Sequence, residues 1–389
     1  MSASNLRGAT AIVGIGHAGL GSAGGHTDME ILALAARRAV ADAGLKMSDI
    51  DGLCTCSASA TMWAMPVAEY LGMRPRFIDS TMLGGSSFVA HLEPAMHALM
   101  AGQCNAVLVC YGSTQRTSTL DRAAVGKMRA VLDPLPYEAP YQPLQPITSY
   151  ALAASRHMHE YGTTREQLAE VAVAARRWAQ LNPLAYSRDA LTIEDVLQAR
   201  MVSDPLSVRD CCLLTDGAGA FVLTRADLAR TLPHEPAYVL GCATEVWHRQ
   251  ISSMENLTVT AASRSGPRAF AAAGLSPGDV DALCLYDAFT INVVLFLEDL
   301  GFCPKGEGGR FVSGGNIAPG GSLAVNTNGG GLSFGHPGMY GVFLILEAVE
   351  QLRGSAGQRQ QRADVALVHG NGATLSSQST ALLGTGATL

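Results

Sequence analysis

The sequence predicts an α/β fold built from two similar halves. One stretch of the chain occurs twice, and apolar strand patterns alternate with helical patterns around both copies. Hydrophobic residues make up 48% and charged residues 15% of the 389 positions, which is enough for a large core. We therefore expect an ordered protein with mainly parallel strands and helices packed against them.

The repeated stretch begins at Ala39 and again at Ala269, an offset of 230 residues (269 − 39 = 230). The letters AVADAGLKMSDIDGLC in the first copy match AFAAAGLSPGDVDALC in the second. In each copy an alanine-rich helix ends at a glycine, and an acidic turn leads into a short apolar strand. A strand pattern precedes each copy, and a glycine-rich turn, a long helix and another strand follow it. We predict an N-terminal half over 1–235 and a C-terminal half over 236–389, related by a pseudo-twofold axis, with central helices between two sheets.

Residues from about 113 to 205 have no counterpart in the second half. A proline-rich stretch over 133–146 is followed by helical patterns over 150–161 and 165–181. We expect this region to be an insertion into the first half.

A glycine-rich loop near the C-terminal end is the strongest candidate for a site. It reads NTNGGGLSFGHPGMYG over residues 326–341 and runs into an apolar helix over 342–352. Glycines let the backbone approach a ligand and present its N–H groups, and a histidine can move a proton near neutral pH. The alternative interpretation is a tight turn that carries a surface histidine, His336.

This loop resembles the histidine loop of the thiolase superfamily, in the branch of lipid-transfer-protein and sterol-carrier-protein thiolases. The Asp216-Gly-Ala sequence and the duplication are similar to that family too. The resemblance implies a duplicated five-layer α-β-α-β-α fold with a loop domain inserted over the active site. It also implies that the insertion binds acyl-CoA, with Arg176 and Arg177 as candidate phosphate contacts; a solvated helix face is the alternative for both.

A thiolase needs a cysteine at the turn that opens the first central helix, where the helix N-terminus lowers the pKa of the thiol. Here that turn reads TMLGGSSF over residues 81–88, and Leu83, or Gly84, takes the cysteine position. Leucine cannot form an acyl-enzyme. Ser86 or Ser87 could replace the nucleophile only with a positioned base.

The segment LYDAFT over residues 285–290 is similar to certain steroid side-chain aldolases of this branch, which also lack the cysteine. The resemblance implies that Tyr286 and His336 act on the α-carbon of an acyl-CoA without a covalent step, with Tyr340 as a weaker candidate. Residues expected to line the substrate are Asn326, Gly330, Gly331, Gly335 and Leu83.

We therefore predict aldol or retro-aldol cleavage of acyl-CoA thioesters. An acyltransferase of the thiolase or Claisen type, using another nucleophile, is the second hypothesis. A non-catalytic lipid or acyl-CoA binding subunit is the third. Family resemblance also implies a homodimer and a small zinc-ribbon and OB-fold partner subunit.

Other features exclude competing functions. The net charge of −6 argues against a general nucleic-acid binder, and no apolar run approaches the length of a membrane span. Nine cysteines without paired spacing indicate free thiols in a reducing compartment, so we expect a cytoplasmic protein with no metal site. We expect no bound cofactor, with coenzyme A present only as part of the substrate.

Overall fold

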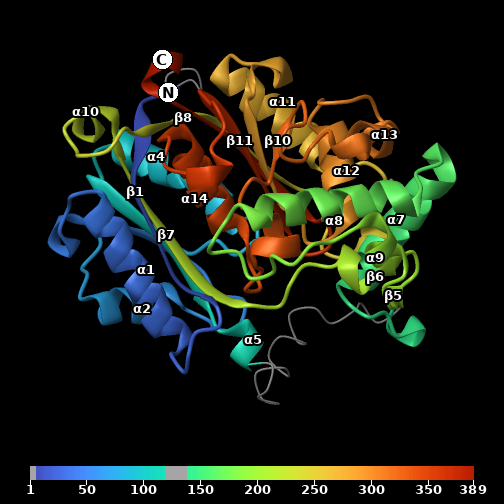
Figure 1. The fold of residues 1–389 in the computed structure, drawn as a ribbon. Helices are drawn as coiled ribbons and strands as arrows, with labels where there is room; N and C mark the ends of the chain where they lie inside the picture. The colour runs from blue at the N-terminus through green and yellow to red at the C-terminus, as the bar shows by residue number, and fades with distance from the viewer. Residues whose placement is uncertain (1–5, 119–137) are drawn as a thin grey trace.

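The computed structural model describes residues 6–118 and 138–389, and within them a ten-stranded sheet crosses the molecule (Figure 1). The order is β3-β2-β4-β7-β1 in the first half and continues as β8-β12-β11-β9-β10 in the second. Read from its outer edge inwards, the second half has the order β10-β9-β11-β12-β8, which corresponds strand by strand to β3-β2-β4-β7-β1 of the first half. A duplication requires this correspondence. The strands are β1 (Thr10–Gly21), β2 (Gly52–Thr55), β3 (Phe77–Asp79), β4 (Ala106–Ser113), β7 (Asp216–Arg225), β8 (Ala237–Val246), β9 (Ala282–Leu285), β10 (Ala324–Val325), β11 (Val365–Gly372) and β12 (Ser377–Gly384).

The sheet is mixed, so the expectation of mainly parallel strands is wrong. β2 and β9 run parallel to both of their neighbours, whereas β7 and β12 run antiparallel to theirs. Only the short turn over 373–376 separates β11 from β12. A parallel connection needs a crossover of a dozen or more residues, so this turn forces an antiparallel pair.

The two expected sheets are joined edge to edge. β1 and β8 pair antiparallel at Ala11 with Tyr238 and at Ile12 with Ala237, which makes the ten strands continuous. α1 covers β1, β4 and β7 on the outside of the first half, and α11 covers β8 and β12 on the outside of the second. α4 and α14 each contact strands of both halves, so they form the central layer of an α-β-α-β-α arrangement (Figure 1). The short helix α5 (Gln115–Ser118) lies at the start of the inserted region. The helices outside the insertion are α1 (Asp28–Asp42), α2 (Ala64–Leu71), α3 (Ser87–Ala90), α4 (Leu92–Met100), α10 (Ala226–Ala229), α11 (Ala262–Ala273), α12 (Thr290–Asp299), α13 (Gly308–Val312) and α14 (Gly341–Leu352).

Matched residues of the repeat make matched contacts. A Cβ added to Gly14 would lie 2.1 Å from the Ala39 carbonyl oxygen, and one added to Gly241 would lie 2.5 Å from that of Ala269. These glycines let β1 lie directly on α1 in the first half, and β8 lie directly on α11 in the second half. The Gly-x-Gly-x-x-Gly pattern that starts at Gly14 is therefore part of the long strand β1.

Asp51 and Asp281 show the same correspondence. The Asp51 carboxylate accepts the Ala106 N–H (3.0 Å), and the Asp281 carboxylate accepts the Val365 N–H (2.9 Å). Each aspartate thus anchors the start of the neighbouring strand, β4 or β11.

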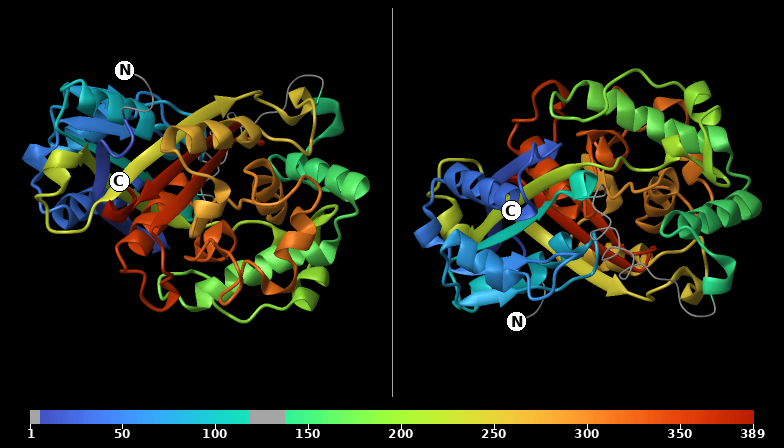
Figure 2. Two further views of the ribbon diagram at one scale, coloured as in Figure 1. Left: turned by 90° about the horizontal axis from the view of Figure 1, so that it is seen from above. Right: turned by 90° about the horizontal axis from the view of Figure 1, so that it is seen from below.

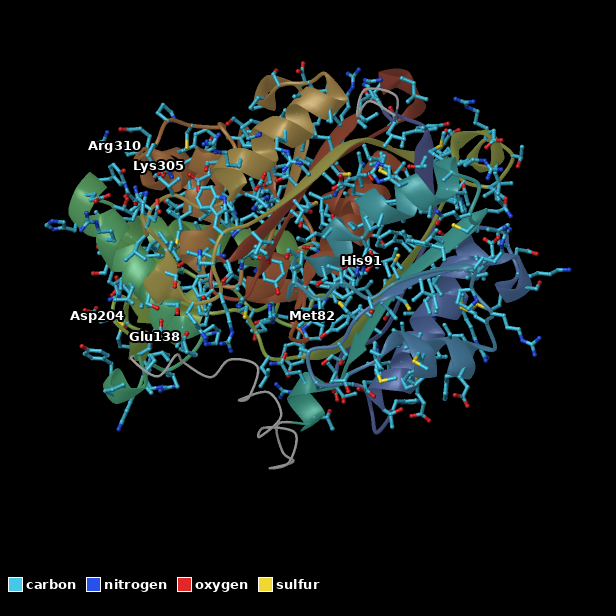
Figure 3. The ribbon with its side chains drawn as sticks, turned by 180° about the vertical axis from the view of Figure 1, so that it is seen from behind. Met82, His91, Glu138, Asp204, Lys305 and Arg310 are labelled. Atoms are coloured by element: carbon cyan, nitrogen blue, oxygen red, sulfur yellow. The ribbon has the colours of Figure 1, made fainter. Side chains whose placement is uncertain are left out.

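The insertion packs on the second half. It contains α7 (Ile147–Tyr161), α8 (Arg165–Gln180), α9 (Ile193–Leu197), β5 (Met201–Ser203) and β6 (Leu206–Ser207). α7 and α8 contact α12, and Figure 2 shows them beside the helices of the second half. Buried Glu298 of α12 bonds His157 of α7 (3.0 Å) and Lys305 (3.0 Å). Figure 3 shows Lys305 and Arg310 on the side of the molecule that also carries Glu138 and Asp204 of the inserted region.

The helical patterns expected over 150–161 and 165–181 are confirmed by α7 and α8. The part of the proline-rich stretch over 133–137 lies outside the described residues. The division of the chain at residue 235 stays a prediction. In the described ranges, no helix combines the length and apolar character that crossing a bilayer demands.

Candidate active site

Tyr286 lies at the carboxyl end of a buried parallel strand. β9 ends at Leu285, and the Tyr286 N–H donates to the His369 carbonyl of β11 (3.0 Å). α12 starts at Thr290, so Tyr286 occupies the short connection between strand and helix. Sites of α/β proteins collect at such strand ends.

Asp287 anchors the glycine loop beside Tyr286. Its buried carboxylate accepts the N–H groups of Gly331 (2.6 Å) and Leu332 (3.3 Å). Gly330 has a φ of +63°, and a Cβ there would lie 2.0 Å from the carboxylate. Glycine is therefore required for the loop to wrap around Asp287.

Tyr286 and His336 are hydrogen bonded to each other. The Tyr286 Oη lies 2.8 Å from the His336 Nε2, with the rings nearly perpendicular at 85°. The Tyr340 N–H donates to the same Oη (3.1 Å). The direction of the bond between Oη and Nε2 follows the histidine tautomer: Nε2 accepts the phenol proton when the imidazole carries its own proton on Nδ1. The backbone N–H of His336 donates to Thr215 Oγ1 (2.9 Å), and this bond fixes the backbone position of the histidine.

Burial keeps both members of this pair neutral. Burial lowers the pKa of His336 to about 4, offset in part by a hydrogen bond with its own backbone. Burial also raises the pKa of Tyr286 well above its ordinary value, although the Tyr340 N–H acts in the opposite direction. Near pH 7 the site thus holds a neutral imidazole that can accept a proton from a neutral phenol. Such perturbed neighbours are typical of acid–base sites.

Comparisons with known proteins identify the superfamily. A family model described as Thiolase C-terminal domain-like matches residues 243–385. The acetyl-CoA acetyltransferase of Methanothermobacter thermautotrophicus is 34% identical over 383 residues, covering 94% of this chain and 96% of that protein. The steroid side-chain-cleaving aldolase of Thermomonospora curvata is 35% identical over 369 residues, covering 90% and 92%.

Solved structures give the same result. The structure of an Ltp2-ChsH2(DUF35) aldolase superposes with a TM-score of 0.88 at 33% identity, covering 98% of both chains. This chain belongs to the thiolase superfamily. Human mitochondrial 3-ketoacyl-CoA thiolase, at 15% identity and a TM-score of 0.74, shares its fold. The thiolase-superfamily assignment made from the histidine loop is confirmed, in the branch that contains the thiolase-like aldolases.

The turn over residues 81–88, which opens α3, contains no cysteine. The residue of the 81–88 turn that packs on the phenol is Gly85, since a Cβ there would lie 2.4 Å from the Tyr286 Oη. Leu83, which with Gly84 as the alternative was expected at the cysteine position, is half-buried. Its carbonyl accepts the hydroxyl groups of Ser86 (3.1 Å) and Ser377 (2.8 Å). The tyrosine ring therefore fills the space that a side chain at Gly85 would need.

The cysteines do not replace the missing nucleophile. All nine fall in the described residues and all are free. Burial raises the pKa of Cys56 to about 12, and burial also raises the pKa of Cys212, which lies close enough to Tyr286 to influence it. A thiolate nucleophile requires the opposite shift.

Neither candidate serine is bonded to an imidazole in the described part of the chain. The Ser86 hydroxyl is buried and bonds Ser377 Oγ (2.7 Å) and the Leu83 carbonyl. The Ser87 hydroxyl donates to the Gly84 carbonyl (2.7 Å) and accepts the Leu83 N–H (2.8 Å). These bonds stabilise the turn that opens α3 and leave no base to activate either oxygen.

Several residues expected to line the substrate have hydrogen-bond or packing partners within the protein. The Gly330 N–H donates to Asn328 Oδ1 (2.8 Å), and the Gly331 N–H is used by Asp287. Buried Asn326 accepts the Leu285 N–H (2.7 Å), which ties the loop to β9. A Cβ on Gly335 would lie 3.0 Å from Thr215 Oγ1, the atom that holds the His336 N–H. These residues shape the loop and its position.

Tyr340 contributes its backbone to the site. Its buried hydroxyl donates to Asn328 Oδ1 (2.9 Å), while its N–H reaches Tyr286. The sequence analysis selected Tyr340 because it lies in the histidine loop.

Sequence reasoning missed Thr215 and Gly85. Thr215 stands directly before the Asp216-Gly-Ala pattern, and that pattern could have indicated it.

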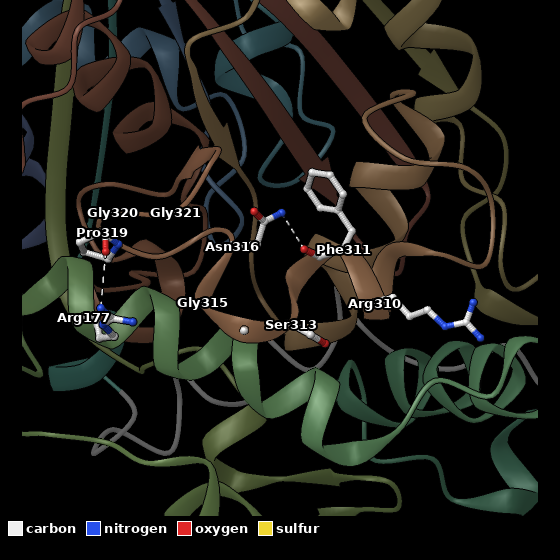
Figure 4. Close-up of a pocket in the computed structure, with 10 residues that line it drawn as sticks. Arg177, Arg310, Phe311, Ser313, Gly315, Asn316, Pro319, Gly320 and Gly321 are labelled. Atoms are coloured by element: carbon white, nitrogen blue, oxygen red, sulfur yellow. Dashed lines mark hydrogen bonds between the residues drawn. The ribbon is translucent and has the colours of Figure 1, made fainter.

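The two candidate phosphate contacts, Arg176 and Arg177, differ in their exposure to solvent. Arg176 is buried and donates to Ser333 Oγ (2.9 Å) and the Asp189 carbonyl (2.9 Å), so it joins α8 to the histidine loop. Arg177 is exposed and lines a hollow of about 460 Å³ with Arg310 and the glycines of the 314–321 loop (Figure 4). Only Arg177 is therefore placed to meet a solvent-borne anion.

Proposed function

We propose that this protein cleaves the bond between the α- and β-carbons of a β-hydroxyacyl-CoA thioester by a retro-aldol reaction. The observation that carries the proposal is the hydrogen bond between Tyr286 and His336. The neighbouring turn over residues 81–88, where the family resemblance predicts a nucleophilic cysteine, contains no cysteine. Relatives named as a steroid side-chain-cleaving aldolase and as 17-hydroxy-3-oxo-4-pregnene-20-carboxyl-CoA lyase support it.

The cleavage step uses the pair as a proton relay. The β-hydroxyl proton moves to the Tyr286 oxygen while the phenol proton moves to the His336 Nε2. The bond between the two carbons then breaks, leaving its electron pair on the thioester enolate and a carbonyl group on the released fragment. The new imidazolium lies close to the enolate charge and stabilises it. Its proton returns through Tyr286 to the α-carbon, which yields the shortened acyl-CoA without any external reductant or oxidant.

Two features support the use of the relay rather than a phenolate base. The high pKa of Tyr286 disfavours a standing phenolate, whereas neutral His336 can accept the proton as it leaves. The Tyr340 N–H stabilises negative charge on the phenol oxygen during the transfer.

The direct test is a panel of β-hydroxyacyl-CoA thioesters given to the purified protein. We expect release of a ketone or aldehyde together with a shortened acyl-CoA, and no acyl-enzyme in intact-protein mass spectrometry. A trapped acyl-enzyme would contradict the proposal and support the acyltransferase, which the acetyl-CoA acetyltransferase relative favours. Binding of the thioesters without turnover would support the non-catalytic subunit.

Assembly is proposed on separate grounds. The relative named Ltp2-ChsH2(DUF35) aldolase carries a second component in its name, so the assay should include a zinc-ribbon and OB-fold partner of that kind.

We also propose a homodimer through the edge strand β3. Exposed apolar side chains gather on β3 and on the segments around it: Met62, Met65, Tyr70, Ile78 and Met82. Light scattering of Ile78→Lys, which should be monomeric, tests this interface.

A further inference from the structure

Tyr150 of the insertion reaches the core of the second half. It lies on α7 with its side chain fully buried, and its ring packs on the Phe289 ring at a centroid distance of 4.3 Å. Phe289 belongs to the same short connection as Tyr286, three residues further along the chain. The insertion thus places an aromatic ring directly behind the strand end that carries the catalytic phenol.

The Tyr150 hydroxyl connects Asn371 near the end of β11 with Ala373 in the β11–β12 turn. It accepts the side-chain N–H of Asn371 (2.8 Å) and donates to the Ala373 carbonyl (2.7 Å). Asn371 cannot rotate freely, because its Oδ1 accepts the Gln378 amide (2.8 Å). Gln378 is itself bonded to His369 (2.9 Å). A chain of buried polar groups therefore orients the turn toward Tyr150.

This turn has an unfavourable backbone. Ala373 and Leu375 have φ angles of +53° and +62°, a region that residues with a side chain rarely adopt. Such conformations persist only where surrounding contacts impose them. The hydrogen bond from Tyr150 to the Ala373 carbonyl is one such contact.

The same turn packs against the Gly84–Gly85 segment. A Cβ on Gly84 would lie 2.9 Å from the Ala373 nitrogen, and a Cβ on Gly372 would lie 1.7 Å from the Leu83 carbonyl oxygen. The two backbones are thus in direct contact. On its other side, Gly85 lies against the Tyr286 ring, where a Cβ would approach to 2.2 Å. Any shift of the turn is transmitted through these glycines to the phenol.

We propose that Tyr150 is a positioning residue for the Tyr286–His336 pair, acting through Asn371, the 373–376 turn and the Gly84–Gly85 backbone. The inserted region then sets the geometry of the proton relay in addition to covering the site. This inference rests on the proposed function for its kinetic test, and a second test is independent of activity.

The kinetic test uses Tyr150→Phe, which keeps the ring on Phe289 and removes only the hydroxyl. We expect kcat to fall about 10-fold with KM changed less than twofold. Asn371→Ala, which removes the donor to the same oxygen, should give the same loss in kcat alone. Tyr161→Phe is the matched control, because Tyr161 lies on the same helix but packs on His157 and Gly306; its kcat should be unchanged.

A double-mutant cycle separates positioning from general destabilisation. If Tyr150 acts through the relay, Tyr150→Phe should cost nothing further in a Tyr286→Phe background. An equal loss in both backgrounds, or a rise in KM with kcat unchanged, would overturn the proposal.

The second test is the histidine spectrum of the free protein. In histidine-labelled protein, the His336 imidazole signal (assigned by its loss in His336→Asn) should shift in Tyr150→Phe and stay in place in Tyr161→Phe. This measurement stands even where no lyase activity is found, so failure of the proposed function and failure of the positioning role are distinguishable. An unmoved His336 signal would overturn the positioning role.

Discussion

The Tyr286 Oη is hydrogen bonded to the His336 Nε2 across 2.8 Å while it accepts the Tyr340 N–H across 3.1 Å. One oxygen thus links a proton acceptor to a backbone donor that stabilises negative charge on it. Gly85 leaves room for the ring that makes this bond. The arrangement suits a proton relay and excludes a side-chain nucleophile at Gly85.

Replacing Tyr286 with phenylalanine should abolish the relay. Positioned acid–base groups contribute roughly 100-fold to 10,000-fold to rate, so we expect kcat to fall at least about 100-fold. Carbonyl release from a β-hydroxyacyl-CoA is the measurement. Tyr340→Phe keeps the backbone N–H and loses only the bond to Asn328, so it should cost about threefold or less. Full lyase turnover in Tyr286→Phe would refute the role given to the phenol.

The pKa of His336 predicts a change in stability with pH. Its folded pKa is about 4 against 6.5 for the ordinary side chain. Between those values the unfolded chain binds a proton that the folded protein does not, so this group makes stability fall as pH falls. The loss is at most about 1.4 kcal/mol per pH unit. Urea unfolding between pH 6.5 and 4.5 should show a smaller loss in His336→Asn than in wild type. The exposed His159 gives the control His159→Asn, which should follow wild type.

Gly85→Ala should displace the Tyr286 ring. The added Cβ would lie within 2.4 Å of three ring and hydroxyl atoms, a distance that requires movement. We expect lyase activity to fall at least about 100-fold, the same loss that we expect for Tyr286→Phe. Gly72→Ala is a control for the general cost of such a change, because a Cβ there meets nothing within 4 Å although φ is +69°. A Gly85→Ala enzyme with wild-type kcat would contradict the packing described here.

Asp287→Asn should loosen the histidine loop. The carboxylate accepts two loop N–H groups, whereas an amide presents its own donors on one side and leaves an N–H unpaired. An unsatisfied buried donor costs about 1–3 kcal/mol. Burial raises the pKa of Asp287 to about 7, so the effect should be clearest above that pH, where the wild-type group is ionised. Thermal unfolding at pH 8, read together with kcat, measures it; an unchanged melting temperature would show that the anchor is dispensable.

Arg177→Gln should raise the KM for CoA thioesters about threefold to tenfold, if the exposed hollow meets a phosphate of the substrate. The kcat value should stay near that of wild type, because Arg177 does not touch the reacting pair. Arg156→Gln, on the exposed side of α7, is the matched control and should leave KM unchanged. A KM equal to wild type in both variants would remove Arg177 from the binding site.

Much of the fold was accessible without coordinates. The repeat at Ala39 and Ala269 predicted two halves, because the same local pattern of helix, acidic turn and strand recurs with the same spacing. The contacts of Asp51 and Asp281 confirm that correspondence at the level of single hydrogen bonds. Strand direction was not accessible, since it depends on which distant strands pair and on how short the 373–376 turn is.

Residue identity and local order were enough to establish the family, the histidine loop and the absence of a cysteine at the opening of α3. Three further facts required the folded chain: Gly85 lies on the phenol, Asp287 accepts the N–H groups of Gly331 and Leu332, and Arg176 is buried while Arg177 is exposed. Each of these depends on contacts between segments tens to hundreds of residues apart, which local sequence patterns do not encode. Tyr150 and Ala373, separated by 223 positions, are the clearest case.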